Sequence, residues 1–498
     1  MTLSDSRGYL LEELKQSRLF ALYTACLRWS TVLLLSLLIV VSLITGSFLL
    51  LKDRTLVYAL DMLIFLAACV TAVVIYKPGQ KYIPGKRVFQ VLLVLGIVLR
   101  IFVFVHDIHD RPRPESDYAK HEILARRLAF EHNYYDSPTP TGTEIKARRP
   151  PGLPLIMALF YKMGTDLAPL ITMTLFQMGV LIAAYLLLMP HRNILALLLF
   201  AYLSISPNIL SMASTSNSQL PHLCLILMML LVLQFFRGRY WESFLVGLLL
   251  GVDALVRLNI FLLLPGLLLF ILAYYGPNKQ AAVKSCIVIA IALIVTILPW
   301  TYRNYRVLGH VVVISETAGT SMHSANVITD PKRGGGYNEI SDEFWVQHPG
   351  LSEIELNRTL QRETIDYIRK NPSIYLKSVP YRLARFMGMQ GWSIQYFFNN
   401  VKSQYPGWVT ALTLKAERFF IWVVFISGFI WVLTRKKILP LQAFVLFAYV
   451  SYVVIDLALF ETGERYHFPY ILFPLLAAAL SRDLMRKHQS DPMRAEQV

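Results

Sequence analysis

The chain has 498 residues, of which 55% are hydrophobic and 16% charged, and its mean hydropathy is +0.49. Soluble domains carry about 25% charged residues, so this composition excludes an ordinary soluble enzyme and indicates an all-α polytopic membrane protein. The formal net charge is +16. Because the basic residues cluster in short stretches between long apolar runs, they mark cytoplasmic loops, and no nucleic-acid partner is expected.

The apolar runs predict the membrane spans. A bilayer core about 30 Å thick is crossed by a helix of roughly 20 apolar residues, and on this criterion we expect about 12 transmembrane helices. They lie near residues 29–51, 57–76, 88–106, 166–189, 193–213, 218–236, 241–256, 258–275, 283–300, 416–434, 438–460 and 467–481. The positive-inside rule places the basic clusters and both termini in the cytoplasm, which leaves two long polar segments outside.

This orientation divides the chain into six regions. They are a cytoplasmic N-terminal segment (1–28), two transmembrane helices (29–87), a transmembrane core (88–300) whose first outer loop is 107–165, an extracytoplasmic domain (301–415), C-terminal transmembrane helices (416–483) and a cytoplasmic tail (484–498).

The first outer loop is rich in ionisable residues. Ser116 and Asp117 precede a helical pattern with one apolar stripe, which predicts an amphipathic helix at the membrane surface. Asp117 is either a functional carboxylate or a residue that caps this helix. The cluster from His106 to Asp110 has no further His or Cys at a supporting spacing, so no metal site is assigned, and a divalent metal stays a minor alternative.

Arginines recur at the expected outer boundary of the membrane. Arg149 precedes Pro150 and Pro151, which hold the chain extended before the next helix. A guanidinium at such a place suits a phosphate or, alternatively, a lipid head group. Asp253 and Arg257 interrupt an apolar run, where we expect a helix break; they are either functional groups or a self-neutralising pair.

The second outer segment is expected to form a mixed α/β subdomain. It begins near Arg303, continues through a short strand at 311–314, and contains helices at 353–370 and 374–387. A last outer turn contains Arg465.

These separate pieces place one acid, Asp117, and several arginines at similar depth on the outer face. The arginines expected to bind a phosphate are Arg149, Arg257, Arg303 and Arg465. A chemistry that fits is displacement at a carbon bonded to a phosphate leaving group. The arginines would hold the departing oxyanion while the carboxylate takes a proton from the attacking hydroxyl.

Four stretches also resemble a known family, the GT-C superfamily of integral-membrane glycosyltransferases. Within it the chain is similar to the bacterial family-39-like branch, which includes the aminoarabinose transferase acting on lipid A and relatives of the protein O-mannosyltransferases. The stretches are the Asp loop 116–128, the Arg-Pro-Pro-Gly-x-Pro stretch 149–154 with 158–161, the Pro-Trp-x-x-Arg-Asn stretch 299–305 with Gly309, Ser315 and Gly319, and the Arg-Tyr-x-x-Pro turn 464–469.

The resemblance runs from about residue 88 to 483 and implies a GT-C architecture with Asp117 as the catalytic base. It implies inverting transfer of a sugar from a polyprenyl-phosphate donor to a glycan, lipid or protein acceptor. The expected location is the bacterial cytoplasmic (inner) membrane, with the active site outside. No cofactor is assigned.

The chain departs from the family in three ways. Two extra spans precede the Asp loop, and His121 stands where the family has an aromatic residue. The second acid that many relatives place beside the Asp would here be Glu115, Glu316 or Glu464. His121, Glu316, Glu464 and Tyr466 are therefore candidate substrate-binding residues.

Other functions would also suit such a chain. A lipid or sugar transporter or flippase is the first alternative. It is less favoured because the polar groups collect on one face and no internal repeat is present. An oligosaccharide ligase or a phosphoethanolamine-type transferase is the second alternative.

Overall fold

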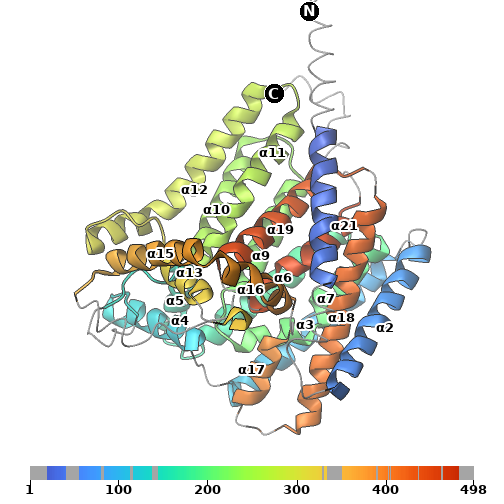
Figure 1. The fold of residues 1–498 in the computed structure, drawn as a ribbon, viewed down its shortest axis with the longest axis horizontal. Helices are drawn as coiled ribbons and strands as arrows, with labels where there is room; N and C mark the ends of the chain where they lie inside the picture. Colours follow the sequence, from blue (N-terminus) through green and yellow to red (C-terminus); the bar gives the residue numbers. More distant parts are fainter. Residues whose placement is uncertain are drawn as a thin grey trace, which may run out of the picture.

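The computed structural model describes residues 20–40, 55–79, 84–112, 116–136, 144–327, 330–333, 350–387, 391–401, 403, 405–435, 437–460, 462 and 464–481. These residues form helices, turns and extended segments, with no β-strand among them. Figure 1 shows long helices side by side, with the shorter helices α4, α5, α13, α15 and α16 gathered at one side.

Within the described chain, 8 helical segments are long and apolar enough to cross a membrane. They are Phe20–Val40, α3 (Lys86–Asp110), α6 (Ala168–Leu188), Ile194–Ser214, Leu258–Tyr275, α12 (Lys279–Leu308), α18 (Gly407–Thr434) and α19 (Pro440–Leu459). Ile194–Ser214 comprises α7 (Ile194–Ile205), α8 (Pro207–Ser211) and a 3-10 turn. The chain is thus a multi-pass membrane protein.

The other expected spans coincide with helices that do not meet this criterion over their described length. They are α2 (Thr55–Gly79), α9 (Gln219–Gln234), α10 (Tyr240–Val256) and α21 (Phe473–Ala479), the last preceded by a 3-10 turn. A helix lies in each expected range, but a full set of 12 crossing helices is not confirmed.

The first helix begins earlier than the sequence predicted. Its described part is Phe20–Val40, whereas the expected span was 29–51. Arg28 explains the shift, because its guanidinium donates to the carbonyls of Val432 (2.9 Å) and Leu433 (2.6 Å). These carbonyls belong to the last turn of α18, where carbonyl groups have no hydrogen-bond donor within their own helix. Arg28 therefore lies inside the helix and caps its neighbour.

The interruption predicted near Arg257 is confirmed. Helix α10 ends at Val256, and Arg257 is extended (φ −149°, ψ 126°). A 3-10 segment, Leu258–Leu263, then leads into α11 (Leu264–Tyr275). Asp253 does not form an ion pair with Arg257 within the described chain; its carboxylate instead contacts His222 Nδ1 at 2.8 Å.

The predicted strand at 311–314 is not formed. Side chains at the end of α12 donate hydrogen bonds to the backbone carbonyl groups that would otherwise pair with a neighbouring strand. Asn304 Nδ2 donates to the Val312 and Ile314 carbonyls (3.1 and 3.0 Å), and Trp300 Nε1 donates to that of Ile314 (3.0 Å). These hydrogen bonds hold the segment against α12. The expected mixed α/β subdomain is not confirmed.

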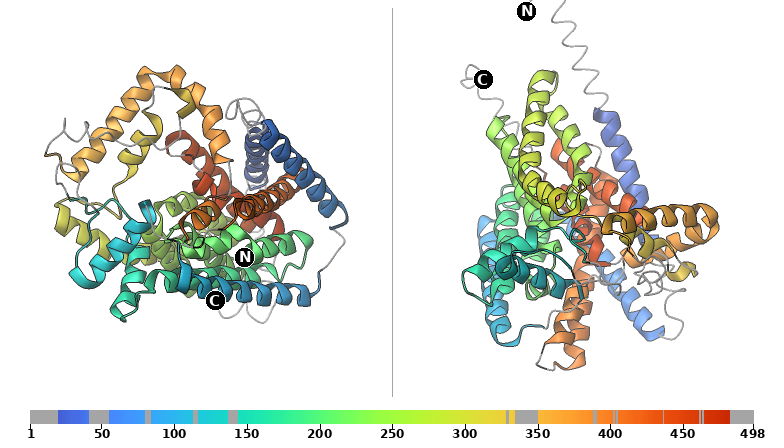
Figure 2. Two further views of the ribbon diagram at one scale, coloured as in Figure 1. Left: turned by 90° about the horizontal axis from the view of Figure 1, so that it is seen from below. Right: turned by 90° about the vertical axis from the view of Figure 1, so that its left-hand side faces the viewer.

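Helices make up most of the described outer segment. They are α13 (Ala318–Asn326), α15 (Glu353–Lys370), α16 (Pro372–Phe386) and α17 (Trp392–Asn400), with a 3-10 turn at Pro331–Arg333. The predicted helix at 353–370 is confirmed, and Ser352 caps it by accepting from Glu355 N. Helix α13 packs on α15, where a Cβ at Gly319 would lie 1.9 Å from the Asn357 carbonyl oxygen. Figure 2 shows these helices projecting from the bundle.

Candidate functional site

A cavity of about 640 Å³ lies where the outer helices meet the bundle. This volume is within the usual range of small-molecule sites. Six parts of the chain line it: α4 (Ser116–Arg126), the segment Arg148–Pro150, the start of α9, the end of α10 with the 3-10 segment, residues 315–324, and the chain from α19 to the short helix α20 (Glu464–His467). Segments far apart in the sequence thus share one chamber.

The start of α4 forms one wall. The helix begins at Ser116, so Asp117 occupies its first turn, and Tyr118, Lys120 and His121 line the cavity. The side chain of Asp117 lies outside the described residues. Helix α4 ends in a π-helical turn at Arg127–Glu131.

Arg149 lies on the next wall because α5 (Gly152–Lys162) starts in close contact with α10. A Cβ at Gly152 would lie 2.8 Å from the Leu255 carbonyl oxygen, so only glycine permits this approach. Tyr134 supports the turn, since its hydroxyl donates to the Arg149 carbonyl at 2.9 Å. Arg149 Nε lies 3.3 Å from Asp136 Oδ2, so this guanidinium is partly neutralised.

Arg257 lies deepest among these cations. Its side chain lines the cavity and the residue is 9% exposed. Among the described residues its guanidinium forms no hydrogen bond and no ion pair with a carboxylate. The residue is largely buried while its guanidinium faces the cavity, so its donors are available to an anion bound there.

Arg465 is the third predicted arginine that the structure brings to the cavity. It belongs to α20, donates to the Tyr466 hydroxyl at 2.5 Å, and lies 4.7 Å from the Tyr466 ring centroid. Tyr466 lines the cavity as well. The side chain of Glu464 lies outside the described residues.

Glu316 also lines the cavity and is held in place by α15. Asn357 Nδ2 donates to Glu316 Oε1 at 2.5 Å, and the Glu316 backbone N–H donates to the Ala147 carbonyl at 2.8 Å. A carboxylate is therefore fixed in the cavity wall beside the segment that contains Arg148 and Arg149.

Arg303 is the predicted phosphate ligand that the structure does not bring to this cavity. Its guanidinium donates to the carbonyls of Lys146 (2.9 Å) and Tyr134 (2.8 Å) and to Asn304 Oδ1 (3.0 Å). It packs over Trp300, 4.9 Å from the ring centroid. Arg303 thus connects α12 to the two loop segments that lead to Arg149.

Glu353 completes this support from α15. Its carboxylate accepts the backbone N–H groups of Lys146 (2.7 Å) and Ala147 (3.0 Å). Burial raises the pKa of Glu353, and these two hydrogen bonds oppose that effect. The loop before Arg149 is therefore held from two sides.

Replacing Arg303 with Met should mainly lower the stability of the folded protein. The effect on its affinity for undecaprenyl phosphate should be smaller. Two carbonyls lose a charged donor, which costs about 2–4 kcal/mol. Thermal unfolding in detergent measures this change, with Arg369→Met on the exposed face of α15 as the control. If Arg303→Met is as stable as the control but loses affinity for undecaprenyl phosphate, Arg303 is a phosphate ligand.

The cavity contains charged groups that the sequence prediction did not include: Lys120, Arg148 and Asp456. Asp456 was detectable in principle as an acid within the apolar run of α19. Lys120 and Arg148 resemble any other surface cation until the fold is known. The described lining side chains comprise Lys120, Arg148, Arg149, Arg257 and Arg465 as cations, with Glu316 and Asp456 as carboxylates. This excess of positive charge favours an anionic ligand.

His106, in the cluster that the sequence suggested for a metal, forms hydrogen bonds with protein side chains. His106 Nδ1 lies 3.0 Å from Asp107 Oδ1, and His106 Nε2 lies 3.1 Å from the Tyr405 hydroxyl. In the part of the chain that the structure describes, no three His, Cys, Asp or Glu side chains are grouped as metal ligands would be.

No family model and no curated protein matches the sequence. Solved structures that match the chain include the following two. One is the archaeal oligosaccharyltransferase AglB from Archaeoglobus fulgidus in complex with an inhibitory peptide and a dolichol-phosphate (TM-score 0.43, 10% identity, covering 79% of this chain and 50% of that one). The other is ArnT from Cupriavidus metallidurans bound to undecaprenyl phosphate (TM-score 0.33, 11% identity, covering 80% and 78%).

The match thus spans about half the length of AglB.

Proposed function

We propose that this chain is an integral-membrane glycosyltransferase that moves a sugar from a polyprenyl-phosphate donor to an acceptor hydroxyl. The observation that carries the proposal is the Arg257 guanidinium, which faces the cavity without a hydrogen-bond acceptor among the described residues. A phosphate supplies acceptors that match the fork geometry of arginine. Arg149 and Arg465 line the same cavity and would share the charge.

The reaction follows from this binding mode. The acceptor oxygen attacks the anomeric carbon from the face opposite the phosphate, so the configuration inverts. The bond between that carbon and the phosphate oxygen breaks, and the polyprenyl phosphate leaves with the electron pair. The arginines stabilise the charge that develops on the leaving oxygen.

Asp117 is the proposed general base that accepts the proton of the attacking hydroxyl. Its support is its position in the first turn of α4, directly before the lining residue Tyr118. Glu316 and Asp456 are the carboxylates of the described lining, and either could orient the acceptor. The acceptor is a glycan, a lipid or a protein, on the outer side of the bacterial inner membrane.

The direct test is transfer in detergent, without a sealed membrane. The purified protein is incubated with undecaprenyl-phosphate sugars and a cell-envelope extract, and mass spectrometry follows the lipids and products. We expect release of undecaprenyl phosphate and the appearance of the sugar on an envelope acceptor. Movement of an unaltered sugar lipid across sealed vesicles, without release of undecaprenyl phosphate in either setting, would instead identify a transporter.

A further inference from the structure

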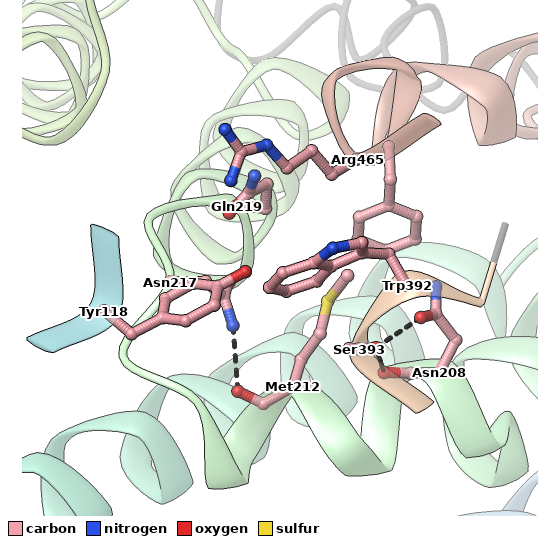
Figure 3. A pocket seen from close by; sticks show the side chains of 9 residues that line it. Tyr118, Asn208, Met212, Asn217, Gln219, Trp392, Ser393 and Arg465 are labelled. Atoms are coloured by element: carbon pink, nitrogen blue, oxygen red, sulfur yellow. Dashed lines mark hydrogen bonds between the residues drawn. The ribbon is translucent and has the colours of Figure 1, made fainter. Parts of the chain in front are cut away.

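A narrow branch leaves the main cavity between α4, the start of α9 and α17. Tyr118, Asn217, Gln219 and Arg465 line both spaces, so the two are continuous. The branch has a volume of about 20 Å³, which is room for one group of the size of a water molecule. Figure 3 shows Arg465 and Gln219 beside the ring of Trp392, with Met212 on the other side of that ring.

Two buried amides face this branch with unused hydrogen-bonding capacity. Gln219 is 7% exposed, and its side-chain amide forms no hydrogen bond with any described residue. Asn208 is 3% exposed, and its Nδ2 likewise donates to no described acceptor. Both residues are largely buried, but their free amide groups open onto the branch, so they offer hydrogen bonds to a polar group that enters it.

The orientation of Asn208 is fixed by the protein. Ser393 Oγ donates to Asn208 Oδ1, and Ser211 Oγ donates to Ser393 Oγ at 2.9 Å. Figure 3 shows the bond from Ser393 to the amide oxygen; this contact occupies the oxygen and leaves the amide nitrogen without a described acceptor. Behind it, Glu417 accepts from Ser206 Oγ at 2.8 Å and holds this turn against α18.

The chemistry of the lining selects the kind of group that fits. Trp392 Nε1 makes no hydrogen bond within the described chain, so it adds a third free donor to the two amides. The described lining contains no carboxylate, and Arg465 lies at the mouth. A hydroxyl would find the amide and indole N–H groups as donors and the Gln219 amide oxygen as an acceptor.

We propose that this branch is a specificity subsite that binds one neutral exocyclic hydroxyl of the donor sugar, such as the hydroxyl of its hydroxymethyl group. The proposal rests on the proposed function. Arg465 carries the assignment to the donor, because it lines both spaces and is a proposed phosphate ligand. The sugar is bonded directly to that phosphate and must lie beside it. Gln219 and Trp392 contact this substituent and determine which sugar is accepted.

The test compares lipids that differ in one substituent. Binding to the purified protein is measured for undecaprenyl phosphate alone and for undecaprenyl phosphates carrying glucose, xylose, galactose or L-arabinose. Within each pair, glucose with xylose and galactose with L-arabinose, the sugars differ by the hydroxymethyl group. No acceptor is added, so only donor binding is observed.

We expect wild type to prefer the hydroxymethyl-bearing member of at least one pair, by about tenfold. Gln219→Leu should reduce this preference ratio by about fivefold, and Trp392→Phe should also reduce it. Neither variant should change the affinity for undecaprenyl phosphate alone by more than about twofold. Gln395→Leu, on the same helix as Trp392 but outside both linings, is the matched control and should behave as wild type.

The outcomes separate the two proposals. Wild type that binds every lipid without preference within either pair contradicts the subsite alone, as does a ratio that neither variant changes. An equal loss of affinity for the bare lipid and the sugar lipids also contradicts it, because the residues would then act on the phosphate or on folding. If wild type binds none of these lipids, the proposed function fails and the subsite with it.

Discussion

Asp117→Asn is expected to lower sugar transfer by about two or more powers of ten, the usual range for removal of a general base. Asparagine has nearly the same volume and suits the start of a helix as well as aspartate does, so α4 should still form. The amide cannot take the proton of the acceptor hydroxyl. Turnover is measured as release of undecaprenyl phosphate from the sugar donor in detergent.

Asp166→Asn is the control for Asp117→Asn. Asp166 lies in the turn between α5 and α6, its side chain is 88% exposed, and it pairs with the half-exposed Arg126 (3.2 Å). This control should retain wild-type turnover. Affinity for undecaprenyl phosphate should be unchanged in both variants, because the base acts on the acceptor. Near-normal turnover of purified Asp117→Asn would exclude it as the base.

Arg257→Gln is expected to weaken binding of undecaprenyl phosphate by about 10- to 100-fold. The reason is that glutamine loses the charge-assisted, two-pronged hydrogen bonds that a guanidinium makes with a phosphate. Stability without lipid should change little, because the guanidinium forms no hydrogen bond and no ion pair with the described residues. Lipid titration followed by thermal unfolding reports both quantities on one sample, since bound ligand raises the unfolding temperature.

Arg358→Gln provides the matched control for Arg257→Gln. Arg358 is exposed on α15 and does not line the cavity, so lipid binding should match wild type. Wild-type lipid affinity in Arg257→Gln would contradict the proposed phosphate site. So would a large loss of stability without lipid, because Arg257 would then be a structural residue.

The elements that the sequence predicted well are those set by local pattern. The interruption at Arg257 follows from polar residues within an apolar run, and helix Glu353–Lys370 follows from its apolar positions and from the Asn371-Pro372 pair that ends it. Arg149, Arg257 and Arg465 were expected at one depth, and they line one cavity. Their roles in phosphate binding stay predictions.

Other features depend on tertiary contacts that no local pattern contains. The strand expected at 311–314 has strand-like residues, but Asn304 and Trp300 hydrogen-bond its carbonyls. Arg303 was predicted from its sequence motif to join the other arginines at the phosphate. Its guanidinium N–H groups instead donate to two loop carbonyls. The sequence predicts the residue type and its approximate depth in the membrane. What a guanidinium binds depends on the hydrogen-bond acceptors that the tertiary fold places near it.

The most direct test of the proposed phosphate site is an experimental structure of the protein with undecaprenyl phosphate in a lipid nanodisc. We expect the phosphate inside the cavity, within hydrogen-bond distance of Arg257 and of Arg149 or Arg465, with the lipid tail directed between helices. A phosphate bound elsewhere on the protein, with Arg257 still lacking an anionic partner, would contradict the account.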